Sequence, residues 1–185
     1  VNARDTIEMA SILFGDGRGR EHGRARIEET PATISLINCN SPLRWDDRML
    51  EAQFEYSAAN QAVVLTPFIL MGAMSPVTIP AALVQQITEA LSGIALSQLI
   101  RPGSPVIFGS FLSNIDMQSG SPTFGTPESG IGLLCTGQIA RHFGLTTPVI
   151  CQQGCSVHLP DGTMTHEFLI DRGLAIEICG YAREI

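Results

Sequence analysis

The residues best suited to chemistry lie in two loops, at 68–78 and 110–126, which each follow a short apolar run. The runs, 62–68 and 105–111, are rich in β-branched and aromatic residues and bounded by Pro and Gly, as buried strands are. In α/β folds the catalytic groups lie in the loops that connect the carboxyl end of a strand to the next helix, so we look for function in these loops. We single out Asp116 in the second loop as a candidate catalytic acid. The common alternative is an Asp that braces its own loop by accepting backbone N–H groups.

Alternating strands and helices are expected to position these loops. Apolar runs predict the strands, and amphipathic stretches with capping residues predict the helices. Strands are predicted at 32–38, 62–68, 105–111 and 147–151, helices at 5–14, 46–60, 78–100 and 126–143, and a charged linker at 15–31. Thr126-Pro127-Glu128 is typical of a helix start, with a cap, a first-turn proline and an acid near the positive end of the helix dipole. Gly130, Gly132 and Gly137 would let that helix pack close to the sheet.

This alternation predicts an α/β fold with a parallel sheet. The spacing of its units fits a (β/α)8 TIM-type barrel, which needs roughly 250 residues. We therefore expect a partial barrel of three to four parallel βα units, followed by an atypical C-terminal tail. The chain has no G-x-G-x-x-G and no P-loop, so a nucleotide-binding sheet is less favoured.

Composition and charge narrow the class of protein. With 185 residues, 44% of them apolar and 16% charged, the chain can form one domain with a core. Its net charge of −7 argues against nucleic acid, and the arginines at 18, 20, 24 and 26 alternate with glutamates, as in a solvated loop. No apolar run is predicted to span a membrane, since 62–74 is short and broken by Pro67. Without a signal-peptide pattern or a C-x₂-C pair among five cysteines, we predict a cytoplasmic protein.

Four stretches carry a resemblance to a known family. They are residues 37–50 (INCNSPLRWDDRML), 66–86 (TPFILMGAMSPVTIPAALVQQ), 98–129 (QLIRPGSPVIFGSFLSNIDMQSGSPTFGTPES) and 136–145 (TGQIARHFGL). Across residues 35–145 the chain strongly resembles the trimethylamine:corrinoid methyltransferase family, including its members without pyrrolysine. Members of that family are about twice this length or more and fold as (β/α)8 barrels. We therefore interpret residues 1–151 as a partial TIM-barrel methyltransferase domain and residues 152–185 as a divergent tail that does not resemble the family.

The resemblance implies a methyltransferase that moves a methyl group from trimethylamine, glycine betaine or a similar amine to cobalt. The cobalt corrinoid would be carried by a partner protein, with no cofactor bound directly to this chain. Co(I) is the nucleophile in this chemistry, and the enzyme supplies position and electrostatics. Because a quaternary ammonium leaves as a neutral amine, no general acid is required. The implied partners are a corrinoid protein and a small methylated amine. Association of the chain into a homo-oligomer is left open.

Within this resemblance, the site must hold a cation with one methyl group aimed at cobalt. Asp116 would offset the substrate's charge or orient its neighbours, and Asn114 is the second candidate catalytic residue. Aromatic rings attract a desolvated quaternary ammonium by roughly 1–2 kcal/mol each. The candidate substrate-binding residues are Asn38, Asn40, Phe68, Met71, Ser110, Gln118 and Phe124. Phe108 and Phe111 are further aromatic candidates, although core packing is the favoured alternative for both. Turn formation is at least as favoured for the two asparagines, and gap-filling is the more usual role of a residue such as Met71.

Two other interpretations stay open. One is a truncated, inactive barrel fragment, whose open parallel edge would favour aggregation unless it pairs. The other is a complete small α/β binding domain sealed by residues 152–185. A frameshift, a misassembled reading frame or a divergent truncated copy would each explain the tail, and the chain opens on Val1 rather than Met. The Cys151, Cys155, His158 and His166 spacings are poor for zinc, so no metal site is predicted.

Overall fold

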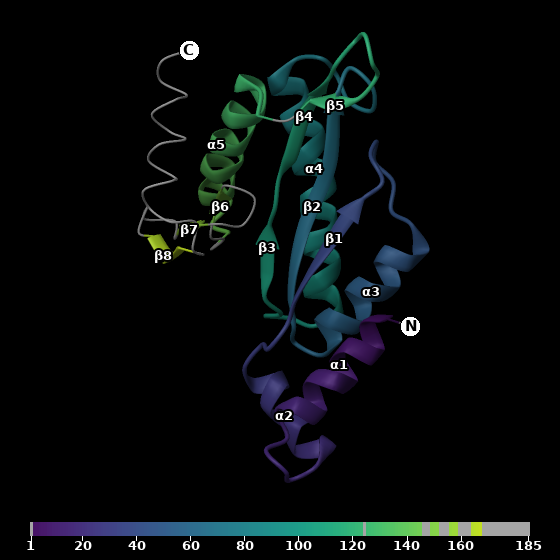
Figure 1. The fold of residues 1–185 in the computed structure, drawn as a ribbon, viewed down its shortest axis with the longest axis vertical. Coiled ribbons are helices and arrows are strands. Elements are labelled where there is room, and N and C mark those ends of the chain that lie inside the picture. Colours follow the sequence, from purple (N-terminus) through teal and green to yellow (C-terminus); the bar gives the residue numbers. More distant parts are fainter. Residues whose placement is uncertain (1, 124, 146–148, 152–155, 159–163, 168–185) are drawn as a thin grey trace. The chain divides into compact units, whose positions relative to one another are not determined.

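The computed structural model describes residues 2–123, 125–145, 149–151, 156–158 and 164–167 (Figure 1). The chain divides into two compact units, Val1–Leu145 and Thr146–Ile185. Side chains are described in the first unit only. The predicted division after residue 151 stays a prediction.

A parallel sheet is the centre of the first unit, as predicted. Its strands are β1 (Ile34–Cys39), β2 (Ala62–Met71), β3 (Val106–Phe108) and β4 (Phe111–Ile115). β2 pairs with β1 on one side, and on the other with β3 along its first half and β4 along its second half. A short strand, β5 (Pro122–Thr123), runs antiparallel to β4. The architecture is compatible with part of an α/β barrel.

The predicted single strand at 105–111 is two strands, separated at Gly109 and Ser110. A Cβ added at Gly109 would overlap the Thr66 hydroxyl of β2. The side chains of Thr66 and Val64 lie against the Gly109 backbone, so a larger residue would force Thr66 to move, and this requirement is absent from the local sequence pattern.

Three helices follow the parallel strands: α3 (Asp47–Ala58), α4 (Ile79–Ile100) and α5 (Pro127–His142). All three were predicted. Asp46 caps α3 by accepting from the Met49 N–H at 2.8 Å, and Thr126 caps α5 by accepting from the Ser129 N–H at 3.3 Å. Thr78 precedes α4 without a side-chain cap bond, so only its position was predicted correctly.

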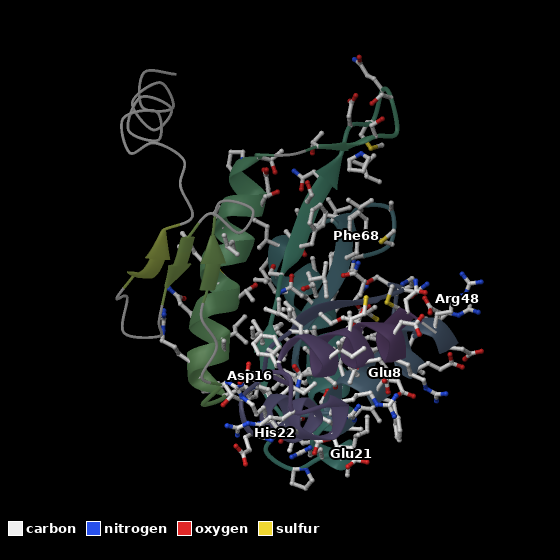
Figure 2. All side chains as sticks on the ribbon, turned by 60° about the horizontal axis from the view of Figure 1, so that its bottom comes forward. Glu8, Asp16, Glu21, His22, Arg48 and Phe68 are labelled. Carbon is white, nitrogen blue, oxygen red and sulfur yellow. The ribbon has the colours of Figure 1, made fainter. Side chains whose placement is uncertain are left out.

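The predicted linker at 15–31 is wrong, because it contains a helix. A helical hairpin of α1 (Asn2–Leu13) and α2 (Arg20–Glu29) lies at the amino ends of the strands (Figure 1). Gly23, which interrupts the sequence pattern, lets α2 approach the backbone of Ser11. Three of the four arginines predicted in a solvated loop form exposed ion pairs on this hairpin: Arg20 with Glu8, Arg24 with Glu28, and Arg26 with Asp16. Glu8 and Asp16 are labelled in Figure 2.

The core lies between the sheet and its helices. Val63, Leu65 and Ile69 of β2 are fully buried, and Ile69 belongs to a cluster with Leu83 of α4 and Leu112 of β4. Because side chains alternate along a strand, the even-numbered residues of β2 face the other way. On that opposite face β1 leaves Ile34 and Leu36 61% and 59% exposed, so the sheet is open over β1 within the first unit, while Val64 and Leu70 of β2 are buried.

Helix α4 is long and apolar enough to cross a membrane by length and composition alone. The sequence argument against a membrane span overlooked this helix. It packs along the back of β2 (Figure 1) and buries Gln86 and Glu89 among its polar side chains. We interpret it as the central core helix of the unit.

The second unit contains β6 (Val149–Cys151), β7 (Ser156–His158) and β8 (Met164–Glu167) in one antiparallel sheet. The expectation that 147–151 adds a fourth parallel strand is therefore wrong. β6 and β7 are joined by a segment too short for the crossover that parallel strands need. Cys155, one of the residues weighed for zinc, lies outside the described residues.

Candidate functional site

Two aromatic rings stack on the open face of the sheet. Phe68 of β2 and Phe111 of β4 are paired in register, and their ring centroids lie 4.5 Å apart at an interplanar angle of 11°. Both side chains are partly exposed, and Phe68 is labelled in Figure 2. Phe108, by contrast, is 5% exposed and belongs to the core, as its alternative interpretation required. Because the rings stack, each turns one face toward the other, which leaves the outer faces and the ring edges of the pair for a ligand.

Polar groups lie one layer below these rings. Asn38 of β1 and Thr66 of β2 are direct partners in the parallel register. The Thr66 hydroxyl is buried without a hydrogen-bond partner among the described residues. Asn40 is exposed at the tip after β1, where its N–H donates to the Arg44 carbonyl at 2.7 Å. The turn interpretation of Asn40 is thus supported by its backbone, and its side chain is exposed.

Asp116 braces its own loop. Its carboxylate accepts from the N–H of Gln118 at 3.1 Å, from the N–H of Ser119 at 3.2 Å and from the Ser119 hydroxyl at 2.6 Å. The Ser119 hydroxyl, followed by the Gln118 N–H, lowers the pKa of Asp116 below its ordinary value of 3.8. The carboxylate is therefore ionised at neutral pH. These bonds match the loop-bracing alternative, and the catalytic role stays a prediction.

Asn114 holds a carboxylate that the sequence reasoning did not select. Its amide donates to Glu128 Oε2 at 3.0 Å, and its own Oδ1 is buried without a partner among the described residues. Alternation along β4 places Asn114 on the helix-facing side with Leu112. Glu128 was considered only as a helix-start signal. The structure thus adds a second acid at the carboxyl end of β4.

The remaining predicted site residues are spread over different surroundings. The Ser110 hydroxyl donates to Gln86 Oε1 at 3.0 Å, and Gln86 donates in turn to Thr136 at 2.8 Å, so Ser110 is tied to α4 and α5. Met71 is 6% exposed and packs in the cluster under α4, as a gap-filling residue does. Gln118 is exposed in the loop after β4. Phe124 lies outside the described residues.

Loop 40–44 after β1 is held by a buried acid, Glu89 of α4. Its carboxylate accepts from the Ser41 hydroxyl at 2.6 Å, the Leu43 N–H at 2.7 Å and the Gln85 amide at 3.0 Å. Nearby, burial and then the charge of Glu89 raise the pKa of the Cys39 thiol to about 12. Glu89 is the only charged residue of α4, which was the signal available in the sequence.

Metal ligands and cavities do not add to the candidate site. Within the part of the chain that the structure describes, no group of three or more His, Cys, Asp or Glu side chains could hold a metal ion. A cavity of about 420 Å³ lies between α2 and the start of β1. Its lining residues precede β1 in the chain, whereas the loops described above follow the strands.

Comparison with known proteins identifies the family. The family model for trimethylamine methyltransferase matches residues 1–170. A glycine betaine methyltransferase from Desulfitobacterium hafniense (strain Y51) is 41% identical over 143 residues, which is 77% of this chain and 28% of that protein. Trimethylamine methyltransferase MttB from Methanosarcina barkeri is 33% identical over 135 residues, or 72% of this chain and 27% of that protein. A second MttB, from Desulfitobacterium hafniense, is 28% identical over 173 residues, or 91% of this chain and 32% of that protein.

The chain thus spans about 30% of the length of these relatives. The family match includes the predicted partial-barrel region and extends beyond the stretch 35–145 in which the resemblance was recognised. The chain belongs to the trimethylamine methyltransferase family.

Proposed function

We propose that this chain carries part of the donor site of a methyltransferase acting on a quaternary amine, with a cobalt corrinoid on a partner protein as the acceptor. Family membership supports the reaction class. The higher identity to a glycine betaine methyltransferase, 41% against 33% and 28% for the two trimethylamine methyltransferases, favours a glycine betaine-like donor.

The stacked pair of Phe68 and Phe111 is the observation that carries the proposal. A quaternary ammonium cannot donate a hydrogen bond, so a protein recognises it through charge and through the faces of aromatic rings. A desolvated cation over the outer face of either ring would gain about 1–2 kcal/mol. The pair lies on the open sheet face at the carboxyl half of β2, where barrel enzymes place their substrates.

A carboxylated donor needs a second contact. Asn38 and Asn40 at the end of β1 supply amide N–H groups that suit a carboxylate. A donor with a carboxylate at one end and a trimethylated nitrogen at the other would place these groups against β1 and against the aromatic pair. This arrangement favours glycine betaine over a donor that has no carboxylate.

The proposed reaction requires the chain to position the substrate and does not require it to transfer a proton. The carbon–nitrogen bond to one methyl group breaks, and its electron pair stays on nitrogen, so the amine leaves neutral. When bound, the partner's corrinoid supplies a Co(I) nucleophile. The residues of this chain hold the cation and fix the direction of one methyl group. The ionised Asp116 adds negative charge to the same end of the sheet.

Methyl transfer from glycine betaine to cob(I)alamin by the purified chain tests this proposal through the absorption spectrum of the cobalamin. We expect turnover, and a loss of about tenfold or more in Phe68→Ala, since about 1.4 kcal/mol corresponds to a factor of ten. Phe54→Ala is the matched control, because Phe54 is 56% exposed on α3, away from the aromatic pair.

Absence of turnover with glycine betaine, trimethylamine and carnitine alike, from a chain that stays folded, would overturn the proposal. That result would favour the alternative of a small α/β binding domain or an inactive barrel fragment.

A further inference from the structure

A buried carboxylate connects two loops at the carboxyl end of the sheet. Glu89 is 1% exposed, and no basic side chain pairs with it among the described residues. Its carboxylate oxygens accept instead from the Ser41 hydroxyl, the Leu43 N–H and the Gln85 amide. Hydrogen bonds to an ionised acceptor are stronger than those between neutral groups. A buried acid is costly unless such donors face it, so the three donors and Glu89 depend on one another.

One face of α4 receives the whole loop after β1. Residues three and four apart lie on the same side of a helix, and Gln85, Glu89, Ser92 and Gly93 follow this spacing. Trp45 donates from Nε1 to the Ser92 hydroxyl at 3.2 Å, and a Cβ added at Gly93 would lie 2.9 Å from its ring. The first part of the loop, at Ser41 and Leu43, therefore contacts Glu89. Its end, at Trp45, contacts Ser92 and Gly93.

Leu43 shows how tightly this loop is fixed. Its φ is +52°, in the left-handed region that a leucine rarely adopts. Such a conformation persists only where the surroundings determine it. The bond from the Leu43 N–H to Glu89 Oε1, 2.7 Å long, is the contact that holds this peptide.

Gln85 extends the connection to the next loop. Its amide donates both to Glu89 Oε1 and to the carbonyl of Met74, each at 3.0 Å. Met74 lies in the turn after β2, where the Gly72 N–H donates to the Ser75 carbonyl. A continuous polar chain thus runs from Leu43 through Glu89 and Gln85 to Met74.

We propose that Glu89 is a positioning residue that fixes the loops after β1 and β2 as one unit, and so places Asn40 relative to the aromatic pair. This inference rests on the proposed function, because it assigns to the loop the task of holding the donor's carboxylate. Glu89 itself does not touch the substrate.

Amide hydrogen exchange measured by NMR tests the coupling on the full chain. In Glu89→Gln one acceptor oxygen becomes an NH₂ donor that faces other donors. We expect exchange at Leu43, Gly72 and Met74 to rise together by about tenfold or more. Gln85→Ala should raise exchange at Gly72 and Met74 and leave Leu43 protected. Thr88→Ala, an exposed neighbour on the same helix, is the matched control and should change none of them.

Two exchange results would overturn the inference. Faster exchange at Leu43 alone in Glu89→Gln would show that the two loops are independent. Equally faster exchange at Val63 in the core of β2 would show that Glu89 only stabilises the fold. If Glu89→Gln does not fold, Gln85→Ala still decides whether the link to Met74 exists.

Donor binding, measured by calorimetry, separates this inference from the proposed function. Glu89→Gln should weaken glycine betaine by about tenfold or more and leave trimethylamine within about twofold, because trimethylamine has no carboxylate for the loop to hold. Equal weakening of both donors would contradict a positioning role. If the wild-type chain binds neither donor, the proposed function fails, while the exchange experiment still decides whether Glu89 couples the loops.

Discussion

Phe68 and Phe111 face each other across the parallel pair β2–β4, with stacked rings whose centroids lie 4.5 Å apart. No local feature of either strand creates this pair, because it depends on the register between segments that α4 separates in the chain. We propose that this pair meets the methylated cation.

Phe111→Leu keeps an apolar side chain of similar size and removes the π face. We expect the affinity for glycine betaine to fall by a factor of about five to thirty, which corresponds to roughly 1–2 kcal/mol for one ring. Calorimetric titration measures this directly. Affinity equal to that of the wild type would mean that the ring serves only to pack against Phe68.

Two glycines of α5 form a matched pair for stability. A Cβ at Gly130 would meet no atom within 4 Å, whereas a Cβ at Gly132 would lie 3.0 Å from Cδ2 of Leu112. Gly130→Ala should stabilise the chain by about 0.5–1 kcal/mol through helix propensity, and Gly132→Ala should lose that gain to crowding. Urea unfolding measures both, and an equal gain in the two variants would contradict the close packing of α5 on β4.

Helix capping gives a second matched pair. Asp46→Ala removes the acceptor of the Met49 N–H and should cost about 1 kcal/mol of unfolding free energy. Thr78→Ala removes no side-chain cap bond, so we expect it to cost much less. Thermal unfolding of both variants is the measurement. A larger loss in Thr78→Ala than in Asp46→Ala would be the contrary result.

Asp116 should titrate below its ordinary pKa of 3.8, because the Ser119 hydroxyl and the Gln118 N–H favour its ionised form. A depressed pKa in the folded state stabilises the loop above the unfolded pKa, and this contribution is lost as the pH falls through the folded value. NMR shifts of the Gln118 and Ser119 amides report the titration. Ser119→Ala should raise the pKa, and a wild-type value at or above 3.8 would contradict the bracing geometry.

The Cys39 thiol should resist ionisation, since burial and then Glu89 raise its pKa from 9.0 to about 12. The folded state therefore holds this proton more tightly than the unfolded state. Its contribution to stability is constant below about pH 9 and declines as the pH rises toward 12. Alkylation at pH 8 should modify Cys39 only after unfolding, and rapid modification of the folded chain would show that the thiol is accessible.

Much of the fold follows from local signals. Helix starts are encoded within a few residues at Asp46 and at Thr126-Pro127-Glu128. In the structure α3 and α5 begin at these positions. Helix α2 was not predicted because it buries only Gly23 and Ile27, so its sequence lacks the apolar periodicity that indicates an amphipathic helix. The break at Gly109 was missed because it depends on Thr66 in the neighbouring strand.

The candidate site was harder to predict than the fold. Asp116 was selected for its position after a strand, and its local hydrogen bonds are also within reach of sequence reasoning. Glu89 and Glu128 were not selected, since their partners Leu43 and Asn114 come from other elements. Side chains that act across elements leave no spacing pattern in the chain, which is why the sequence located the loops but not their connections.

Nuclear Overhauser contacts between the methyl protons of bound glycine betaine and the Phe rings test the central claim most directly. The account predicts contacts from those methyl protons to the rings of both Phe68 and Phe111, and their loss in Phe111→Leu. Binding with contacts only to other residues, or no binding by the folded chain, would contradict it.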